Sequence, residues 1–200
     1  MANTFLLILF AYLIGSIPFG LIVSKITSGT DPRTQGSGNI GFTNVFRTVS
    51  KKAGIYTLIG DVGKGFLAIT ALPMSMISNI TEPQLLLIGF GVVIGHCYPV
   101  FLYFRGGKGV ATALGAIAGI DPVLATLLLG IWILALAIWK FSALAALLSS
   151  ASLPIIVAYF YTGPEKTIFA VALAIVIWVR HKDNIKRLIQ GAEPRIRPKS

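Results

Sequence analysis

The chain has 200 residues, of which 55% are hydrophobic and only 12% are charged, and its mean hydropathy is +0.82. Soluble domains carry roughly a quarter charged residues, so this composition excludes an ordinary soluble protein. The formal net charge of +10 would suit a nucleic-acid partner, but the cations lie in loops between apolar runs, which argues against one. We expect an all-α, polytopic membrane protein with a single membrane-embedded domain over residues 1–200.

Seven apolar runs follow one another along the chain and predict transmembrane helices. They are Phe5–Val23, Ala53–Ile77, Gln84–Tyr103, Val110–Ile120, Pro122–Trp139, Phe141–Tyr161 and Thr167–Val179. A spanning helix needs about 20 apolar residues, so the shorter runs Val110–Ile120 and Thr167–Val179 predict thin, tilted or partly interfacial helices. The first run is too long for the apolar part of a signal peptide and no basic residue precedes it, so we expect no cleavable signal.

The Lys and Arg residues fall mainly on one predicted side of the membrane. If the seven runs alternate, only Lys166 lies in an opposite loop and Lys64 lies inside a run, out of 17 such residues. The positive-inside rule then places the N-terminus outside and the C-terminus in the cytoplasm. The net charge is explained mainly by this topology, with attraction to anionic lipid head groups as a secondary effect.

The first cationic loop, residues 36–47, is rich in glycine and in short polar side chains. Its candidate ligands for an anion are Ser37, Asn39, Thr43, Asn44 and Arg47. Arginine can hold a phosphate through two N–H groups while hydroxyl and amide groups donate beside it. The alternative is a solvated turn whose Asn and Ser side chains satisfy their own backbone.

The second cationic loop contains the run Phe104-Arg105-Gly106-Gly107-Lys108-Gly109-Val110-Ala111-Thr112. Glycine lets backbone N–H groups turn toward a ligand, and the helix predicted from Val110 begins with free N–H groups that favour an anion. Neither loop fits the pattern G-x-x-x-x-G-K-[ST], so a nucleotide P-loop is not indicated. Because both loops lie on the same predicted side, they predict a site for a phosphorylated substrate at a membrane surface.

Four further polar residues lie in or next to the apolar runs. Asp61 and Lys64 are three residues apart, hence on one helix face, where they form either a functional site or a structural ion pair. His181 and Asn184 share a face just after the last run. We expect His181 to contact substrate, with the capping of helix carbonyls as the alternative.

The chain has one cysteine, Cys97, and two histidines, His96 and His181. A disulfide or a metal site built from Cys and His is therefore not expected. We expect no cofactor, with a magnesium ion that accompanies a bound phosphate as an open alternative. His96 either braces a loop or reacts, and Cys97 is expected to pack. The spacings Gly91-xxx-Gly95 and Gly115-xxx-Gly119 are typical of closely packed helices.

These blocks together resemble the PlsY family of bacterial acyl-phosphate:glycerol-3-phosphate acyltransferases. The matching residues are Gly15-Ser16-Ile17-Pro18-Phe19-Gly20, Gly36-Ser37-Gly38-Asn39, Thr43, Asn44, Arg47, Gly95, His96, Pro99, Phe104 to Thr112, His181, Asn184, Ile185, Arg187 and Leu188. Two departures are Phe42, where a small residue is expected, and a glycine within residues 61–65, where leucine is usual.

The resemblance implies a seven-helix enzyme of the bacterial cell (inner or plasma) membrane, with its active site facing the cytoplasm. It implies transfer of a fatty acyl group from acyl phosphate to glycerol 3-phosphate, in the first step of phospholipid biosynthesis. The products are lysophosphatidic acid (1-acyl-glycerol 3-phosphate) and inorganic phosphate. We expect a monomer that contacts membrane lipids and binds no nucleic acid.

On this basis Ser37, Lys108 and His181 are expected to be catalytic. The residues expected to bind substrate are Ser37, Asn39, Thr43, Asn44, Arg47, Gly106, Gly107, Lys108, Gly109, Thr112, His181 and Asn184. The glycerol phosphate is assigned to Arg47, Lys108, His181 and Asn184 with Ser37, and the acyl-phosphate head group to Thr112 and the Gly106–Gly109 amides. The proton acceptor is either a phosphate oxygen of a substrate, which we favour, or His181.

Two other functions are compatible with parts of the sequence. A membrane transporter for a phosphorylated small solute would explain Asp61 and Lys64 within a span, although the outer loops offer few polar residues for a continuing path. A structural or regulatory membrane protein would leave both glycine-rich loops without a purpose.

Overall fold

The structure is a computed structural model that describes residues 2–74 and 79–196, and within these ranges it contains helices and loops but no strand. The helices are α1 (Ala2–Gly15), α2 (Phe19–Ser28), α3 (Phe42–Thr48), α4 (Lys51–Met74), α5 (Glu82–Cys97), α6 (Val110–Ile120), α7 (Pro122–Trp139), α8 (Ser142–Phe160), α9 (Pro164–Arg180) and α10 (Lys182–Ile189). Two short 3₁₀ turns are η1 (Pro32–Thr34) and η2 (Val100–Leu102). The predicted all-α class is confirmed.

Five segments of the described chain are long and apolar enough to cross a membrane. They are Thr4–Ser28, Lys51–Met74, Glu82–Leu102, Pro122–Trp139 and Ser142–Phe160. The short predicted run Val110–Ile120 coincides with α6, and Thr167–Val179 lies within α9. Ile77, at the end of the second predicted run, lies outside the described residues. The polytopic character is confirmed, and the count of seven spans stays a prediction.

A break interrupts the first predicted run, which the sequence pattern indicated as one helix. α1 ends at Gly15 and α2 begins at Phe19, with Pro18 between them. Proline has no N–H to donate and disfavours a helical conformation in the residue before it, so the run does not continue as one helix. Lys64 of α4 stabilises the break, because its Nζ donates to the carbonyl oxygen of Ile17 at 2.9 Å.

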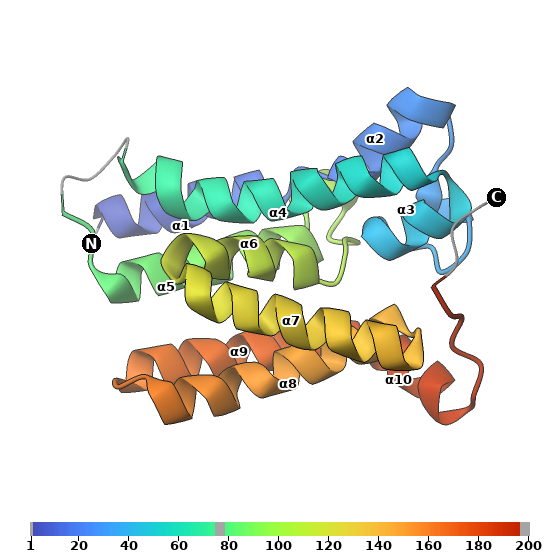
Figure 1. The fold of residues 1–200 in the computed structure, drawn as a ribbon. Helices are drawn as coiled ribbons and strands as arrows, with labels where there is room; N and C mark the ends of the chain where they lie inside the picture. Colours follow the sequence, from blue (N-terminus) through green and yellow to red (C-terminus); the bar gives the residue numbers. More distant parts are fainter. Residues whose placement is uncertain (1, 75–78, 197–200) are drawn as a thin grey trace.

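The helices form two groups that lie side by side (Figure 1). One group contains α1, α4, α5 and α6, and the other contains α7, α8 and α9. α6 contacts α7 where the groups meet, and α5 contacts α9. Val92 of α5, Ala116 of α6 and Leu173 of α9 are fully buried in the core that these helices share. The seam between the groups is therefore apolar along most of its length.

Glycines bring the helices of the first group into close contact. A Cβ added at Gly95 would collide with the backbone carbonyl of Tyr12 in α1, and one added at Gly115 would collide with that of Val62 in α4. The other glycine of each predicted spacing also faces α1 or α4. The predicted packing role of both spacings is confirmed.

Both glycine-rich loops lie at the end of the bundle that also carries α2, α3 and α10 (Figure 1). The chain near residue 196 is tied to the same end, because the Ile196 N–H donates to the carbonyl oxygen of Lys140 at 2.9 Å. The cations predicted to share one side therefore meet here, apart from Arg197 and Lys199, which lie outside the described residues. The orientation of this end relative to the membrane stays a prediction.

Candidate active site

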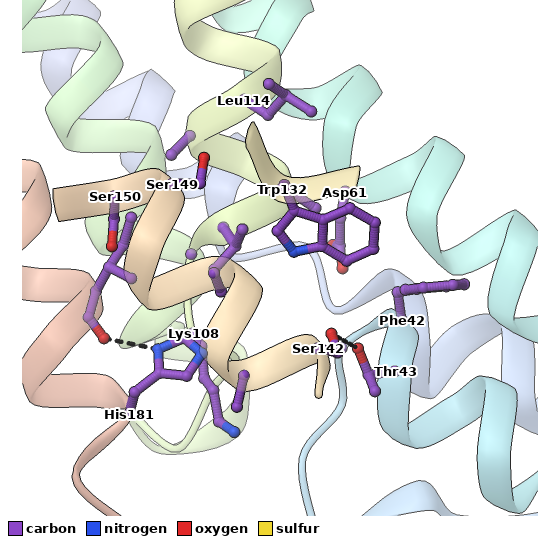
Figure 2. Close-up of a pocket in the computed structure, with 18 of the residues that line it drawn as sticks. Phe42, Thr43, Asp61, Lys108, Leu114, Trp132, Ser142, Ser149, Ser150 and His181 are labelled. Carbon is purple, nitrogen blue, oxygen red and sulfur yellow. Dashed lines mark hydrogen bonds between the residues drawn. The ribbon is translucent and has the colours of Figure 1, made fainter. Parts of the chain in front are cut away.

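A cavity of about 400 Å³ reaches from this end of the bundle into the seam between the two groups. Its mouth is polar and is lined by Ser37, Asn39, Thr43, Arg47, Lys108, His181, Asn184 and Glu193. Its interior is mainly apolar and is lined by side chains that include Leu114, Ile117, Leu128, Trp132 and Leu153. Figure 2 shows Lys108 close to His181, with Trp132 and Leu114 further along. The cavity suits an amphipathic molecule with an anionic head.

Asn44 of α3 organises the first glycine-rich loop. Its Oδ1 accepts from the Ser37 N–H at 3.0 Å, and its Nδ2 donates to the carbonyl oxygens of Pro32, Gln35 and Asn39 at 2.9, 3.1 and 2.8 Å. The loop in turn presents Ser37 and Asn39 to the cavity. Asn44 lines the cavity, but its buried amide group already makes these four hydrogen bonds, so we interpret it as a residue that positions the loop. The direct binding of substrate that we predicted for Asn44 stays a prediction.

The second glycine-rich loop is fixed by contacts from α5 and α9. The Gly107 N–H donates to the carbonyl oxygen of His96 at 3.0 Å, and the Arg180 guanidinium donates to the carbonyl oxygens of Gly106 and Gly107 at 2.8 and 3.0 Å. Contrary to the prediction, the Gly107 N–H is therefore not available to a phosphate, and neither glycine lines the cavity. The role of this pair is to place the following residue, Lys108, which does line it.

Two predicted substrate-binding residues lie at the start of α6, and only Gly109 of the two lines the cavity. Gly109 has a φ of 85°, a left-handed conformation that favours glycine, and it lines the cavity where the helix begins. Thr112 is 0% exposed and lies outside the cavity lining, with Gly65 of α4 packed against its backbone. The predicted contact of Thr112 with a phosphate is therefore corrected, because its turn of the helix faces α4.

A chain of polar side chains connects the second loop to α10. Lys108 Nζ donates to Asn184 Oδ1, and Asn184 Nδ2 donates to Glu193 Oε1 at 2.7 Å. Arg187 Nε donates to the other carboxylate oxygen of Glu193, also at 2.7 Å. The sequence interpretation missed Glu193, although it is the only acidic residue among the cations that follow Asp183. It also missed Arg180, which adjoins His181 in the sequence.

Burial sets the protonation of the two residues at the centre of the mouth. It lowers the pKa of Lys108 to about 8. Burial also lowers the pKa of His181 to about 4, and the nearby charge of Lys108 contributes. His181 Nδ1 lies 2.7 Å from the carbonyl oxygen of Ile177, which can only accept, so Nδ1 carries the proton of the neutral ring. The ring therefore offers Nε2 as a hydrogen-bond acceptor.

The opposite wall of the mouth is formed by α3 and the start of α8. Thr43 Oγ1 and Ser142 Oγ are 2.8 Å apart and join the two helices (Figure 2). Arg47 Nη1 donates to the carbonyl oxygen of Pro194 at 3.3 Å, and burial lowers the pKa of its guanidinium, which still remains protonated at neutral pH. Arg47 and Lys108 thus bring two cations to one mouth, as a phosphate site requires.

The predicted pair of Asp61 and Lys64 is an ion pair inside the bundle. Asp61 Oδ1 lies 2.9 Å from Lys64 Nζ and 3.4 Å from His96 Nδ1, and all three residues are buried. Asp61 and His96 also line the cavity. Because the backbone of His96 holds Gly107, this cluster connects the break after α1 with the second glycine-rich loop. The ion pair is confirmed, and its role in function stays a prediction.

Residue types that bind metals are dispersed within the described part of the chain. No group of three His, Cys, Asp or Glu side chains gathers there as a metal ion would need. Cys97 is buried in the apolar core, in agreement with its predicted packing role.

Comparison with known proteins identifies the family. The sequence model of a family described as glycerol-3-phosphate acyltransferase matches residues 5–191. This chain belongs to the glycerol-3-phosphate acyltransferase family. A relative of that name in Nitrosospira multiformis is 43% identical over 97% of this chain and 96% of its own length. Another relative, in Dechloromonas aromatica, is 42% identical over 93% of this chain and 92% of its own length. The predicted family is confirmed.

Solved structures support the same assignment for this acyltransferase family member. The glycerol 3-phosphate form of PlsY, described as an integral membrane glycerol 3-phosphate acyltransferase, matches with a TM-score of 0.89 and 36% identity over 96% of this chain and 94% of that chain. Its lysophosphatidic acid form matches with a TM-score of 0.86 and 34% identity. The chain therefore has the fold of an integral membrane acyltransferase.

Proposed function

We propose that this protein transfers a fatty acyl group from acyl phosphate to glycerol 3-phosphate, releasing lysophosphatidic acid and inorganic phosphate. The observation that carries the proposal is one cavity that joins a mouth containing Lys108 and Arg47 to an apolar interior in the helix seam. Both substrates have a phosphate that needs cations, and one also has a hydrocarbon chain that needs apolar walls. The names of the relatives and the two ligand forms of PlsY support the acceptor and the product.

We assign the glycerol phosphate to Arg47, Lys108, His181 and Asn184, with Ser37 beside them. Arg47 and Lys108 supply the positive charge, and Asn184 fixes the Lys108 ammonium through its side-chain oxygen. The neutral ring of His181 accepts a hydrogen bond from a glycerol hydroxyl through Nε2. The acyl-phosphate head would lie near Lys108 and Gly109, with its chain along Leu114 and Trp132.

The reaction needs little activation because acyl phosphate is a mixed anhydride. The glycerol hydroxyl oxygen attacks the acyl carbonyl carbon, a new ester C–O bond forms, and the bond from that carbon to the phosphate oxygen breaks. Alignment of the two substrates and stabilisation of the negative charge by Lys108 supply much of the acceleration.

The hydroxyl proton passes to a phosphate oxygen of a substrate, and the phosphate then leaves. A pKa of about 4 makes His181 a weak base at neutral pH. The carboxylates that line the cavity, Asp61 and Glu193, are each held by other side chains. A substrate oxygen is therefore the better acceptor, and His181 orients the hydroxyl.

We further propose that the protein acts as a monomer in the bacterial cell membrane, with the cavity mouth in the cytoplasm. The gathering of cationic loops at the end that carries the mouth supports this orientation.

The test is an assay of the purified protein with saturated acyl phosphates from decanoyl to palmitoyl and labelled glycerol 3-phosphate. Lysophosphatidic acid and inorganic phosphate are expected in equal amounts, and a Lys108→Ala variant that stays folded should abolish them. Near-normal turnover in that variant would overturn the site assignment. Uptake of labelled glycerol 3-phosphate into proteoliposomes without acylation would favour a transporter instead.

A further inference from the structure

A second, smaller cavity of about 70 Å³ lies in the same helix seam, beyond the apolar end of the first. Leu124 of α7, Val157 of α8 and Phe169 of α9 line it. Two residues, Ile117 and Leu153, line both cavities. The described structure therefore places a wall of aliphatic side chains from α6 and α8 between two hollow spaces.

The helices show that the two cavities lie end to end. On α7, Leu128 lines the first cavity and Leu124, about one helical turn away, lines the second. On α6, Leu114 lines only the first, Ile117 lines both, and Ile120 lines only the second. A hydrocarbon chain that followed the seam inward from Lys108 would therefore meet the wall before it reached the second cavity.

The wall is tightly packed, since Ile117 is 3% exposed and Leu153 is 2% exposed. Side chains in such cores fill their space as densely as an organic crystal, so the hydrocarbon chain has no room to pass between Ile117 and Leu153. Truncating one of them would leave a void that joins the two cavities.

The far end of the second cavity is polar and limits its depth. Tyr161 Oη donates to Asp121 Oδ2 at 2.5 Å, and Lys166 Nζ lies 3.0 Å from Glu82 Oε1. All four residues line this end. The terminal methyl group of an acyl chain would displace water from these polar groups without offering them a hydrogen bond. These groups therefore mark the furthest point that an acyl chain could reach.

We propose that Ile117 and Leu153 are the chain-length stop of the acyl site, and that in the wild type they close the second cavity to the terminal methylene groups of the acyl chain. The inference rests on the proposed function. Ser142 at the mouth and Leu153 are 11 positions apart on α8, or roughly 16 Å at the helical rise. An extended chain advances about 1.2 Å per bond, so this length holds about 13 carbon atoms.

The test compares kcat/KM for saturated acyl phosphates from decanoyl to eicosanoyl in the wild type and in Leu153→Ala. The truncated wall is expected to shift the optimum to longer chains, with each newly buried methylene raising kcat/KM about fourfold. Leu153→Phe is expected to shift the optimum to shorter chains. Ile117→Val, which removes one methyl group, provides a milder opening if Leu153→Ala does not fold.

Val157→Ala is the matched control, because Val157 is on the same helix and lines only the second cavity. It enlarges that space without opening the wall, so its chain-length profile should equal that of the wild type. An unchanged profile in both Leu153 variants would overturn the proposal and show that the chain leaves the seam sideways into lipid. Wild-type protein that uses no acyl phosphate of any length would instead refute the proposed function.

Discussion

Lys108 combines a half-buried ammonium group, a pKa of about 8 and an amide partner, Asn184. Its positive charge is the property that a phosphate would recognise. Because burial favours the neutral amine, the charge of Lys108 in the free protein is lost as the pH rises through about 8.

The first prediction is therefore an alkaline decline of kcat/KM for glycerol 3-phosphate centred near pH 8. This ratio reports the ionisation of the free enzyme and the free substrate. Lys108→Arg keeps a cation at every accessible pH, so its decline should move to higher pH even if its maximum rate is lower. A decline at the same pH in both proteins would show that another group is responsible.

The second prediction concerns Glu193, which accepts from Asn184 and Arg187. Glu193→Ala leaves both partners without their acceptor, and a hydrogen bond to a charged group contributes about 1.5–3 kcal/mol, so kcat/KM should fall about 10- to 100-fold. Glu193→Gln keeps one acceptor oxygen and should recover part of the loss. The control is Glu165→Ala, an exposed residue at the opposite end of the bundle, which should leave the kinetics unchanged.

At the scale of single residues, sequence patterns could predict which residues line the cavity mouth better than what each of them does there. Ser37, Lys108 and His181 are brought together as predicted, because each lies in a short polar segment at the end of an apolar run. Thr112 belongs to the same motif but faces another helix. Arg180 holds backbone carbonyls, and no sequence pattern could indicate which ones before the loop was folded.

Among the elements, the contact between α4 and α6 positions the site most directly, because α6 begins one residue after Gly109. A side chain at Gly115 would collide with the backbone of α4, whereas one at Gly63 would meet open space. The spacing of α4 and α6 therefore depends on the absence of a side chain at Gly115.

The third prediction is that Gly115→Leu destabilises the fold by about 1–3 kcal/mol or more through overpacking, and lowers activity by displacing the start of α6. The measurement is thermal unfolding in detergent together with the acyl-transfer rate. Gly63→Leu adds the same side chain within α4 and should change the unfolding free energy by no more than about 0.5 kcal/mol. Equal losses in both variants would contradict the packing argument.

Hydropathy predicted where helices occur but not where the first one breaks. The run from Phe5 to Val23 is apolar throughout, so an average over it does not register Pro18. The break is stabilised by residues that are distant in the sequence. Lys64 Nζ donates to the carbonyl oxygen of Ile17, and Ser16 Oγ lies 3.4 Å from the carbonyl oxygen of Gly95. Such contacts depend on the tertiary arrangement of α4 and α5, which a one-dimensional profile does not contain.

For the whole molecule, the two ends of the bundle differ in charge, and this asymmetry predicts orientation. The fourth prediction is that the end carrying α10 faces the cytoplasm. A cysteine placed at Lys186 should react with a membrane-impermeant maleimide only after cells are permeabilised, whereas one at Glu165 should react in intact cells. Cys97 is buried, so the unsubstituted protein is the control for background labelling. The opposite pattern would reverse the assigned topology.

The hydrogen bonds from Lys108 through Asn184 to Glu193 also mean that the site is completed only late in translation. The ribosome makes Lys108 76 positions before Asn184, an interval of roughly 4 to 15 s at ordinary elongation rates. During that interval α6 to α9 are being made, and the cation at the mouth lacks the partner that fixes it. A nascent chain would thus enter the bilayer before it could consume a reactive acyl donor, and its activity would begin only once the last contact had been translated.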